Sequence, residues 1–298
     1  MSFYFKDYAL ICKSLFVFIN IISVAQAKIS EIETTRLMST AGAGIGAVLM
    51  DESTILNPAP LAFFNMSSIY FQKGNTSAKV DGNTSDSLSD SDQLSFIASD
   101  SGSNLSGSIG YFKQSNNLGE DRKTWSFAAA SPVTKSSSFG VNYQMQKEAV
   151  LENGEIVNKS YKISNMGFFH ALDQKFSFGV LATDVFANKS ARSKAFLGTQ
   201  YVYDNMISLM VDVGSIYKED LAENMISRAA LQVKFYNDFF LRFGAKEDKS
   251  EKTRGNGIGI GWVQPKLVVD LALANEKQNM GSIPTVDRTT SFSLAYKF

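Results

Sequence analysis

Short segments in which apolar residues alternate with small or polar ones repeat along most of this chain. In the last eight residues, SFSLAYKF, one set of alternate positions holds Phe, Leu, Tyr and Phe, and the other holds Ser, Ser, Ala and Lys. A period of two places successive side chains on opposite faces of a β-strand. About fourteen such segments start near residues 67, 93, 104, 124, 138, 160, 175, 194, 207, 226, 239, 255, 266 and 288.

The connections between these segments alternate between short and long. Turns such as PVTKS, ALDQ and QPK are short, whereas QSNNLGEDRK, AVLENGEIVN and NEKQNMGSIPTV are longer and mostly charged. An even number of antiparallel strands with tight turns at one end and longer loops at the other is typical of an outer-membrane barrel. Ten residues in a strand tilted by roughly 40° cover about 25 Å, the height of the apolar band of such barrels. We therefore predict an all-β fold, a 14-stranded antiparallel transmembrane β-barrel formed by residues 67–298.

The first 27 residues have the layout of a secretory signal peptide. Lys6 and Lys13 precede or begin the apolar run SLFVFINIISV, and AQA ends at Ala27, where cleavage is expected. This run is too short to span a membrane, and no later apolar stretch reaches about twenty residues. The only cysteine, Cys12, lies in this segment, so the exported chain would have no disulfide and no cysteine ligand or nucleophile. The expected location is the outer membrane of a Gram-negative bacterium.

The charge balance argues against a nucleic-acid partner. The chain has 29 Lys and Arg and 29 Asp and Glu, and residues 1–27 hold two lysines and one aspartate, which leaves 27 basic and 28 acidic groups. Binding to phosphate backbones needs a concentrated basic face, and no run of like charge occurs. The partners expected of such a barrel are outer-membrane lipid, lipopolysaccharide and the barrel-assembly machinery.

Residues 28–66 precede the first predicted strand and include the glycine-rich stretch AGAGIGAVLMDESTILNPAP. A phosphate-binding glycine loop must follow a buried strand and open a helix, and neither context is present. A fourteen-stranded barrel encloses a space that is either a water channel or plugged. We predict that residues 28–66 are a hatch in this space, with Gly42, Gly44 and Gly46 letting its backbone turn and approach the wall closely.

The stretch STAGAGIGAVLMDESTILNPAP, followed by LAFFNMSSIYFQ, resembles the hatch and first strand of the FadL family of outer-membrane transporters for long-chain fatty acids and other hydrophobic compounds. The resemblance extends to the related PorV-type proteins of a secretion system. It implies fourteen strands, a hatch of this size and an Asn-Pro-Ala motif, here Asn57, Pro58 and Ala59. Two features depart from the family: Pro60 follows the motif where most members have glycine, and residues 28–298 form a much shorter chain, with little room for extended outer loops.

The C-terminus also resembles a known signal. Phe292, Leu294, Tyr296 and Phe298 fall on one face of the last predicted strand. This pattern resembles the one by which the barrel-assembly machinery recognises its clients.

Two sets of residues are candidates for the function. Apolar hatch residues either line a small ligand pocket or form the core of the hatch; they are Leu49, Met50, Ile55, Leu56, Leu61, Phe63 and Phe64. Charged residues expected on inner strand faces either pair with one another and the hatch, which we favour, or line an aqueous path; they are Asp212, Arg228, Lys234, Arg242, Lys246 and Asp270.

Enzymatic and metal-dependent functions are disfavoured. His170 is the only histidine, and no nucleophile stands beside it in sequence, so no catalytic residue is assigned. Asp81, Asn83, Ser85 and Asp92 match positions 1, 3, 5 and 12 of a calcium loop, but the sixth position lacks the required glycine. A solvated acidic loop is the better interpretation, and we expect no metal and no cofactor.

The favoured function is passive uptake of small hydrophobic, fatty-acid-like molecules through an outer-membrane channel gated by the hatch. Asn57 would hold the hatch through side-chain hydrogen bonds. Two alternatives stay open. The barrel could dock secreted or surface proteins without transporting anything, as the PorV resemblance allows, or it could be a water-filled porin for polar solutes.

Overall fold

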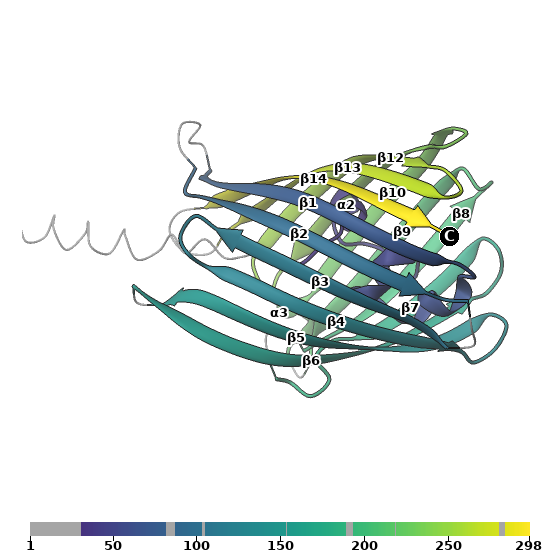
Figure 1. Ribbon diagram of the computed structural model, residues 1–298, viewed down its shortest axis with the longest axis horizontal. Coiled ribbons are helices and arrows are strands. Elements are labelled where there is room, and N and C mark those ends of the chain that lie inside the picture. The colour runs from purple at the N-terminus through teal and green to yellow at the C-terminus, as the bar shows by residue number, and fades with distance from the viewer. Residues whose placement is uncertain are drawn as a thin grey trace, which may run out of the picture.

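The chain forms one closed antiparallel β-barrel in the computed structural model (Figure 1). The structure describes residues 31–81, 87–102, 105–152, 154–188, 193–217, 219–279 and 284–298, so the expected signal peptide lies outside the described residues. Each of the fourteen described strands pairs with its neighbours in sequence, and β1 pairs with β14 to close the sheet. The predicted fold class and strand number are confirmed.

The strands are β1 (Ser67–Val80), β2 (Ser89–Asp100), β3 (Ser106–Asn116), β4 (Asp121–Pro132), β5 (Ser137–Glu152), β6 (Glu155–Ala171), β7 (Phe176–Ala182), β8 (Lys194–Tyr203), β9 (Ile207–Ile216), β10 (Ile226–Tyr236), β11 (Phe239–Asp248), β12 (Thr253–Val263), β13 (Leu267–Gln278) and β14 (Thr285–Lys297). The helix α2 (Thr35–Ser39) and the 3-10 helices η1 (Asp51–Thr54) and η2 (Ala59–Phe63) precede β1. A short helix, α3 (Leu221–Asn224), lies between β9 and β10. Among the described residues, no helix is long and apolar enough to cross a membrane.

Two of the predicted long loops are mostly strand, which corrects the sequence prediction. The segment 114–123 holds the end of β3 and the start of β4, and the segment 149–158 is divided between β5 and β6. The strands continue because cross-strand pairing persists among polar residues, as far as Glu152 opposite Glu155. The longer connections at this end are 81–88, 183–193, 217–225 and 279–284. The two ends of the barrel therefore differ less in loop length than we expected.

The outer surface of the barrel is apolar and the inner surface is largely polar. On β1, Phe71 is 42% exposed while the next residue, Gln72, is completely buried. On β4, Trp125 is 45% exposed and Ser126 is completely buried. Large apolar side chains that face outward all around a closed sheet are suited to a hydrocarbon environment, because lipid rather than water must cover them.

Residues 31–66, here called the N-terminal segment, lie inside the barrel against the inner faces of the strands (Figure 1). Its helix α2 packs on β11 to β14, and η1 and η2 pack on β2 to β6. Thr34 caps α2, since its hydroxyl accepts a hydrogen bond from the Leu37 N–H at 3.2 Å. The helix ends where Ala41 and Gly42 take positive φ angles of 50° and 78°. The backbone thus turns at the start of the glycine-rich stretch.

Glycines of the wall let this segment approach the strands. A Cβ atom on Gly198 of β8 would lie 2.7 Å from the Ile45 Cβ and 2.9 Å from the Gly46 nitrogen, closer than real Cβ contacts. A Cβ atom on Gly140 of β5 would lie 2.6 Å from the Ala59 nitrogen. The sequence analysis predicts close approach from the glycines of the segment, and inward glycines of the strands also allow it.

Substitution of Gly198 tests this packing. We expect Gly198→Val to destabilise the docked segment by about 1–3 kcal/mol, because the added methyl groups overlap Ile45 and Gly46. The matched control is Gly107→Val in β3, where an added Cβ meets nothing closer than a carbonyl oxygen at 3.9 Å. The measurement is the rate of tryptic cleavage at Arg36 in the folded protein. Equal cleavage rates in the two variants would contradict the packing argument.

Candidate functional site

Asn57 fastens the N-terminal segment to itself and to the wall. Its side-chain amide donates hydrogen bonds to the carbonyl oxygens of Ile45, at 2.9 Å, and of Phe168 in β6, at 3.1 Å. Its side-chain oxygen accepts from the Ala59 N–H at 3.1 Å. Asn57 is only 2% exposed, so all these bonds are shielded from water.

The rest of the Asn-Pro-Ala motif starts η2. Pro58 precedes this 3-10 helix, and Pro60 occupies one of its first positions, where no backbone N–H is needed. Ser138 of β5 donates a hydrogen bond from its hydroxyl to the Ala59 carbonyl oxygen at 2.7 Å. Pro60, which departs from the family pattern, therefore fits in the first turn of η2.

Hydroxyl and amide side chains of the wall satisfy further carbonyl groups of the segment. Ser126 and Asn142 both donate to the Thr54 carbonyl oxygen, at 2.7 and 2.8 Å. Ser177 donates to the Gly46 carbonyl oxygen at 2.7 Å. Since an unpaired buried carbonyl destabilises a protein, these bonds hold an irregular backbone inside the barrel.

The glycine-rich turn binds a carboxylate of the wall. Asp212 of β9 is completely buried, and one of its carboxylate oxygens accepts from the Gly44 N–H at 2.8 Å and from the Ile45 N–H at 3.2 Å. Gly44 has a φ of 148°, which side-chain-bearing residues rarely adopt. The predicted inner charge Asp212 thus binds the backbone of the segment.

Arg228 of β10 binds the same glycine-rich turn. Its guanidinium donates to the Gly42 carbonyl oxygen at 3.1 Å and lies 5.0 Å from the centre of the Phe196 ring. Arg228 also stands directly opposite Asp212 in the pairing of β10 with β9. Its Nε atom is buried, and it has no hydrogen-bond partner among the described residues.

A second group of charges fills the interior beside α2. Arg242 is 1% exposed, pairs with Asp270 at 2.5 Å and donates to the Gln232 side chain at 2.8 Å. On the segment, Arg36 lies 3.8 Å from the Glu52 carboxylate. Each of these arginines therefore has a carboxylate partner inside the barrel.

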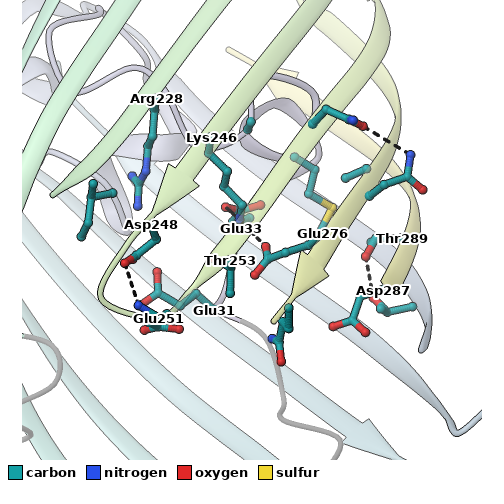
Figure 2. Close-up of a pocket in the computed structure, with 18 residues that line it drawn as sticks. Glu31, Glu33, Arg228, Lys246, Asp248, Glu251, Thr253, Glu276, Asp287 and Thr289 are labelled. Atoms are coloured by element: carbon teal, nitrogen blue, oxygen red, sulfur yellow. Dashed lines mark hydrogen bonds and ion pairs between the residues drawn. The ribbon is translucent and has the colours of Figure 1, made fainter. Parts of the chain in front are cut away.

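The remaining predicted charges lie towards the two ends of the barrel. Lys246 points towards Glu33 of the segment and Glu276 of β13, at 3.5 and 2.5 Å (Figure 2). Lys234 lies near the opposite end, where its ammonium is 5.9 Å from the centre of the Phe240 ring. A basic residue that we did not single out, Lys194 of β8, pairs with Asp248 and Glu251 at 3.3 and 3.5 Å.

Two adjoining cavities lie between the segment and the strands. The first, here called the acidic vestibule, is shown in Figure 2; its charged lining residues are Glu31, Glu33, Arg228, Lys246, Asp248, Glu251, Glu276 and Asp287. The second, here called the mixed pocket, shares Glu31, Glu33 and Arg228 with the first. Its apolar lining residues are Ile32, Leu37, Ile55, Leu56, Ile163, Leu181 and Phe196, and Thr124, Gln144, Asn165, Thr183 and Lys194 add polar groups.

Only part of the predicted hatch pocket reaches these cavities. Ile55 and Leu56 line the mixed pocket, whereas Leu49 packs behind them against the core. Met50, Leu61 and Phe64 belong to a separate cluster with Ala130. Phe63 packs against Phe169 of β6 with the two rings tilted and their centres 5.3 Å apart.

The wall supplies the other apolar residues of the mixed pocket. Leu181 and Phe196 stand on inward faces that are otherwise small or polar, next to Gly179 and Gly198. We did not identify them from sequence, although a bulky apolar residue on such a face is the signal that could have found them. Their position beside Leu56 depends on closure of the barrel.

His170 lies at the end of β6 that joins the tight turns. Its Nδ1 is 2.7 Å from the Ser137 hydroxyl, and its ring packs against the tilted ring of Phe178. A hydrolase triad places a carboxylate at the second ring nitrogen, and no such bond to His170 occurs among the described residues. The described residues also contain no group of three or more His, Cys, Asp or Glu placed to hold a metal. Asn83 and Ser85 of the calcium-loop pattern lie outside the described residues.

The C-terminal pattern lies on the outer face of β14. Phe292, Leu294, Tyr296 and Phe298 are 42%, 39%, 48% and 61% exposed. The rings of Tyr296 and Phe298 stack with centres 6.1 Å apart. These residues are therefore available to a partner outside the barrel, and recognition by the assembly machinery stays a prediction.

Structural comparison finds solved barrels whose fold is similar to that of this chain. The Pseudomonas putida toluene transporter TodX superposes with a TM-score of 0.67 at 11% identity, covering 92% of this chain and 99% of that one. The Ralstonia pickettii toluene transporter TbuX gives 0.65 at 10%, covering 89% and 98%, and a Pseudomonas aeruginosa FadL homologue gives 0.61 at 9%, covering 91% and 99%. No family model and no curated protein matches the sequence. The likeness shows a FadL-like fold.

Replacement of Asn57 tests its role as a fastener. We expect Asn57→Ala to weaken docking of the segment by about 1–3 kcal/mol, because the buried carbonyls of Ile45 and Phe168 lose a donor. The measurement is conductance of the protein in planar bilayers. The control is Asn275→Ala, because Asn275 is exposed and, among the described residues, its side chain bonds only to Asn256. Unchanged conductance and uptake in Asn57→Ala would show that the segment does not depend on this residue.

Asp51 predicts a pH dependence of docking. Burial and the neighbouring Glu52 raise the pKa of Asp51 to about 6, against the opposing effect of a 2.7 Å hydrogen bond from Ser68. A raised pKa favours the neutral carboxyl, so its contribution to stability is complete below about pH 4 and is lost as pH rises through about 6. We expect docking at pH 7.5 to be weaker than at pH 5 by about 1.4 kcal/mol, because the contribution falls only between pH 5 and the docked pKa of about 6.

The pH dependence is measured as the frequency of channel openings at pH 5 and pH 7.5. Asp51→Asn should remove most of the difference, because an amide does not titrate. Asp173→Asn is the control: Asp173 lies in an exposed turn, and hydrogen bonds from the Lys175 and Phe176 N–H groups lower its pKa, so it stays ionised at both values. A difference that survives in Asp51→Asn would assign the effect to another group.

Proposed function

We propose that this chain, which has the fold of FadL-type transporters, is an outer-membrane channel for passive uptake of small hydrophobic molecules, with the N-terminal segment as its hatch. The observation that carries the proposal is the mixed pocket. Leu56 of the segment and Leu181 and Phe196 of the wall line it together, so a ligand there would touch both the hatch and the barrel. The pocket combines an apolar side with polar and charged groups, and such groups fix the orientation of a small ligand.

The polar groups of the mixed pocket narrow the class of ligand. The Thr124 hydroxyl and the Arg228 Nε are buried and have no hydrogen-bond partner among the described residues. Both can donate to a ligand, and unpaired buried donors are costly, so an acceptor on the ligand would satisfy them. We therefore propose small apolar molecules that carry a hydrogen-bond acceptor, a class that includes fatty-acid-like carboxylates.

The solved neighbours support hydrophobic uptake. TodX and TbuX are described as toluene transporters, and CymD, with a TM-score of 0.66 at 12% identity over 88% of this chain and 96% of its own, is described as a monoaromatic hydrocarbon channel. The filled interior around Arg242 and Asp270 argues against a wide porin. A barrel that only docks secreted or surface proteins has no need of a pocket between the hatch and the wall, so the mixed pocket does not favour that role.

The hatch is tested by single-channel conductance in planar bilayers. We expect the chain of residues 28–298 to be closed and a chain lacking residues 28–64 to conduct, because the segment and its ion pairs occupy the interior. Heat-dependent gel migration confirms that both barrels are folded. Steady conductance from the longer chain would establish an open aqueous pore and replace the proposal with a porin.

The mixed pocket is tested by uptake into proteoliposomes of radiolabelled octanoate, a small apolar molecule with a carboxylate acceptor. We expect Phe196→Ser and Leu56→Asn each to reduce uptake about fivefold or more, since a polar group replaces apolar contact with the ligand. Phe63→Ser is the matched control, because Phe63 packs on Phe169 away from the pocket. Equal uptake by the pocket variants and the control would contradict the assignment of the pocket.

A further inference from the structure

Three lysines form a row across neighbouring strands on the outside of the barrel. Lys113 of β3 is directly opposite Lys123 of β4, and Lys123 is directly opposite Lys147 of β5. All three side chains are exposed. Directly opposed residues on antiparallel strands have Cβ atoms about 5 Å apart, and like charges at this spacing destabilise a sheet. A bound anion would relieve this repulsion. We call these three residues the lysine row.

Two further outward lysines extend the basic surface. Lys73 of β1 is opposite Leu94, which is itself opposite Lys113. Lys162 of β6 is opposite Met145, two residues from Lys147. Within the part of the chain that the structure describes, the only ion pair of the lysine row is that of Lys123 with Asp121, at 2.7 Å.

Two other outward cations at this end of the barrel pair with carboxylates of the protein. Arg254 pairs with Glu247 at 2.7 Å, and Lys277 pairs with Asp81. The lysine row differs because its neighbours across the sheet are other lysines. Directly opposed lysines thus stand on β3, β4 and β5, with Lys73 of β1 and Lys162 of β6 beside them.

An aromatic row lies directly beside the lysine row. One step along the same outer face, Tyr111 of β3 is opposite Trp125 of β4, with ring centres 4.8 Å apart, and Trp125 is opposite Met145. Aromatic residues of transmembrane barrels gather where hydrocarbon meets the headgroups. The lysines stand on the loop side of these rings, away from the C-terminus, and so at the level of headgroups in the outer leaflet.

We propose that the lysine row binds the phosphate groups of lipopolysaccharide in the outer leaflet. Three ammonium groups in register present a surface to a diphosphorylated lipid headgroup, while the aromatic row contacts the start of its acyl chains. The proposal rests on the outer-membrane location but not on the mixed pocket, so it stands or falls separately from substrate uptake.

The test measures binding of diphosphorylated lipid A to the refolded chain of residues 28–298 in detergent. The variant is Lys113→Gln/Lys123→Gln/Lys147→Gln, and we expect its affinity to fall by roughly 10- to 100-fold. The same three positions changed to Arg should keep affinity within about threefold, because the charge is retained. The double variant Arg254→Gln/Lys277→Gln is the matched control, since it removes outward cations that already have partners.

Two probes distinguish the phosphate groups of the lipid from free phosphate as the bound group. We expect dephosphorylated lipid A to bind weakly to every variant, and millimolar inorganic phosphate to leave lipid binding unchanged. Wild-type affinity in the triple Gln variant, an equal loss in the double control, or full competition by inorganic phosphate would each overturn the proposal. Heat-dependent gel migration verifies folding, and the single variants Lys113→Gln and Lys147→Gln provide the measurement if the triple variant does not fold.

Discussion

Closure of the sheet through β1 and β14 is the constraint on which the other features depend. Their pairing runs from Ser68 opposite Lys297 to Val80 opposite Thr285, so neither terminal strand keeps a free edge. In hydrocarbon, an unpaired edge would leave backbone donors and acceptors without water. Closure also creates an interior that lipid cannot reach. The outward face can then be apolar throughout, while the inward face must be filled by the protein itself or by water.

The interior is filled by an irregular segment whose backbone needs hydrogen bonds. Ser126, Ser138 and Ser177 donate to its carbonyl oxygens, and Asp212 accepts from two of its N–H groups. Small residues are required at these contacts, because a larger side chain would hold the segment away from the wall. Packing and hydrogen bonding therefore explain together why the inward positions of the strands are rich in Ser and Gly.

The glycine-rich turn binds an anion as a phosphate-binding loop does, but the anion is a side chain of the barrel and the contact holds the segment in place. Consecutive N–H groups at Gly44 and Ile45 converge on one carboxylate oxygen, as they would on a phosphate. The anion is Asp212, a residue of the wall far away in sequence. The same turn holds Arg228 through the Gly42 carbonyl and sets this cation at the border of both cavities. Anchoring of the segment and the chemistry of the candidate site thus share one turn.

The sequence by itself determined the number of strands, their order and which side chains face outward, because a period of two is a local property that each strand shows alone. It overestimated the lengths of the loops at 114–123 and 149–158. Polar residues beyond the apolar band look like a loop in the sequence, but their backbones still pair with the neighbouring strand. The partners of the inner charges and the lining of the mixed pocket were decided only by the tertiary structure. Lys246 meets Glu33, and Leu56 meets Phe196, across long separations in the chain. Such contacts depend on the register and closure of the whole barrel, which no single segment encodes.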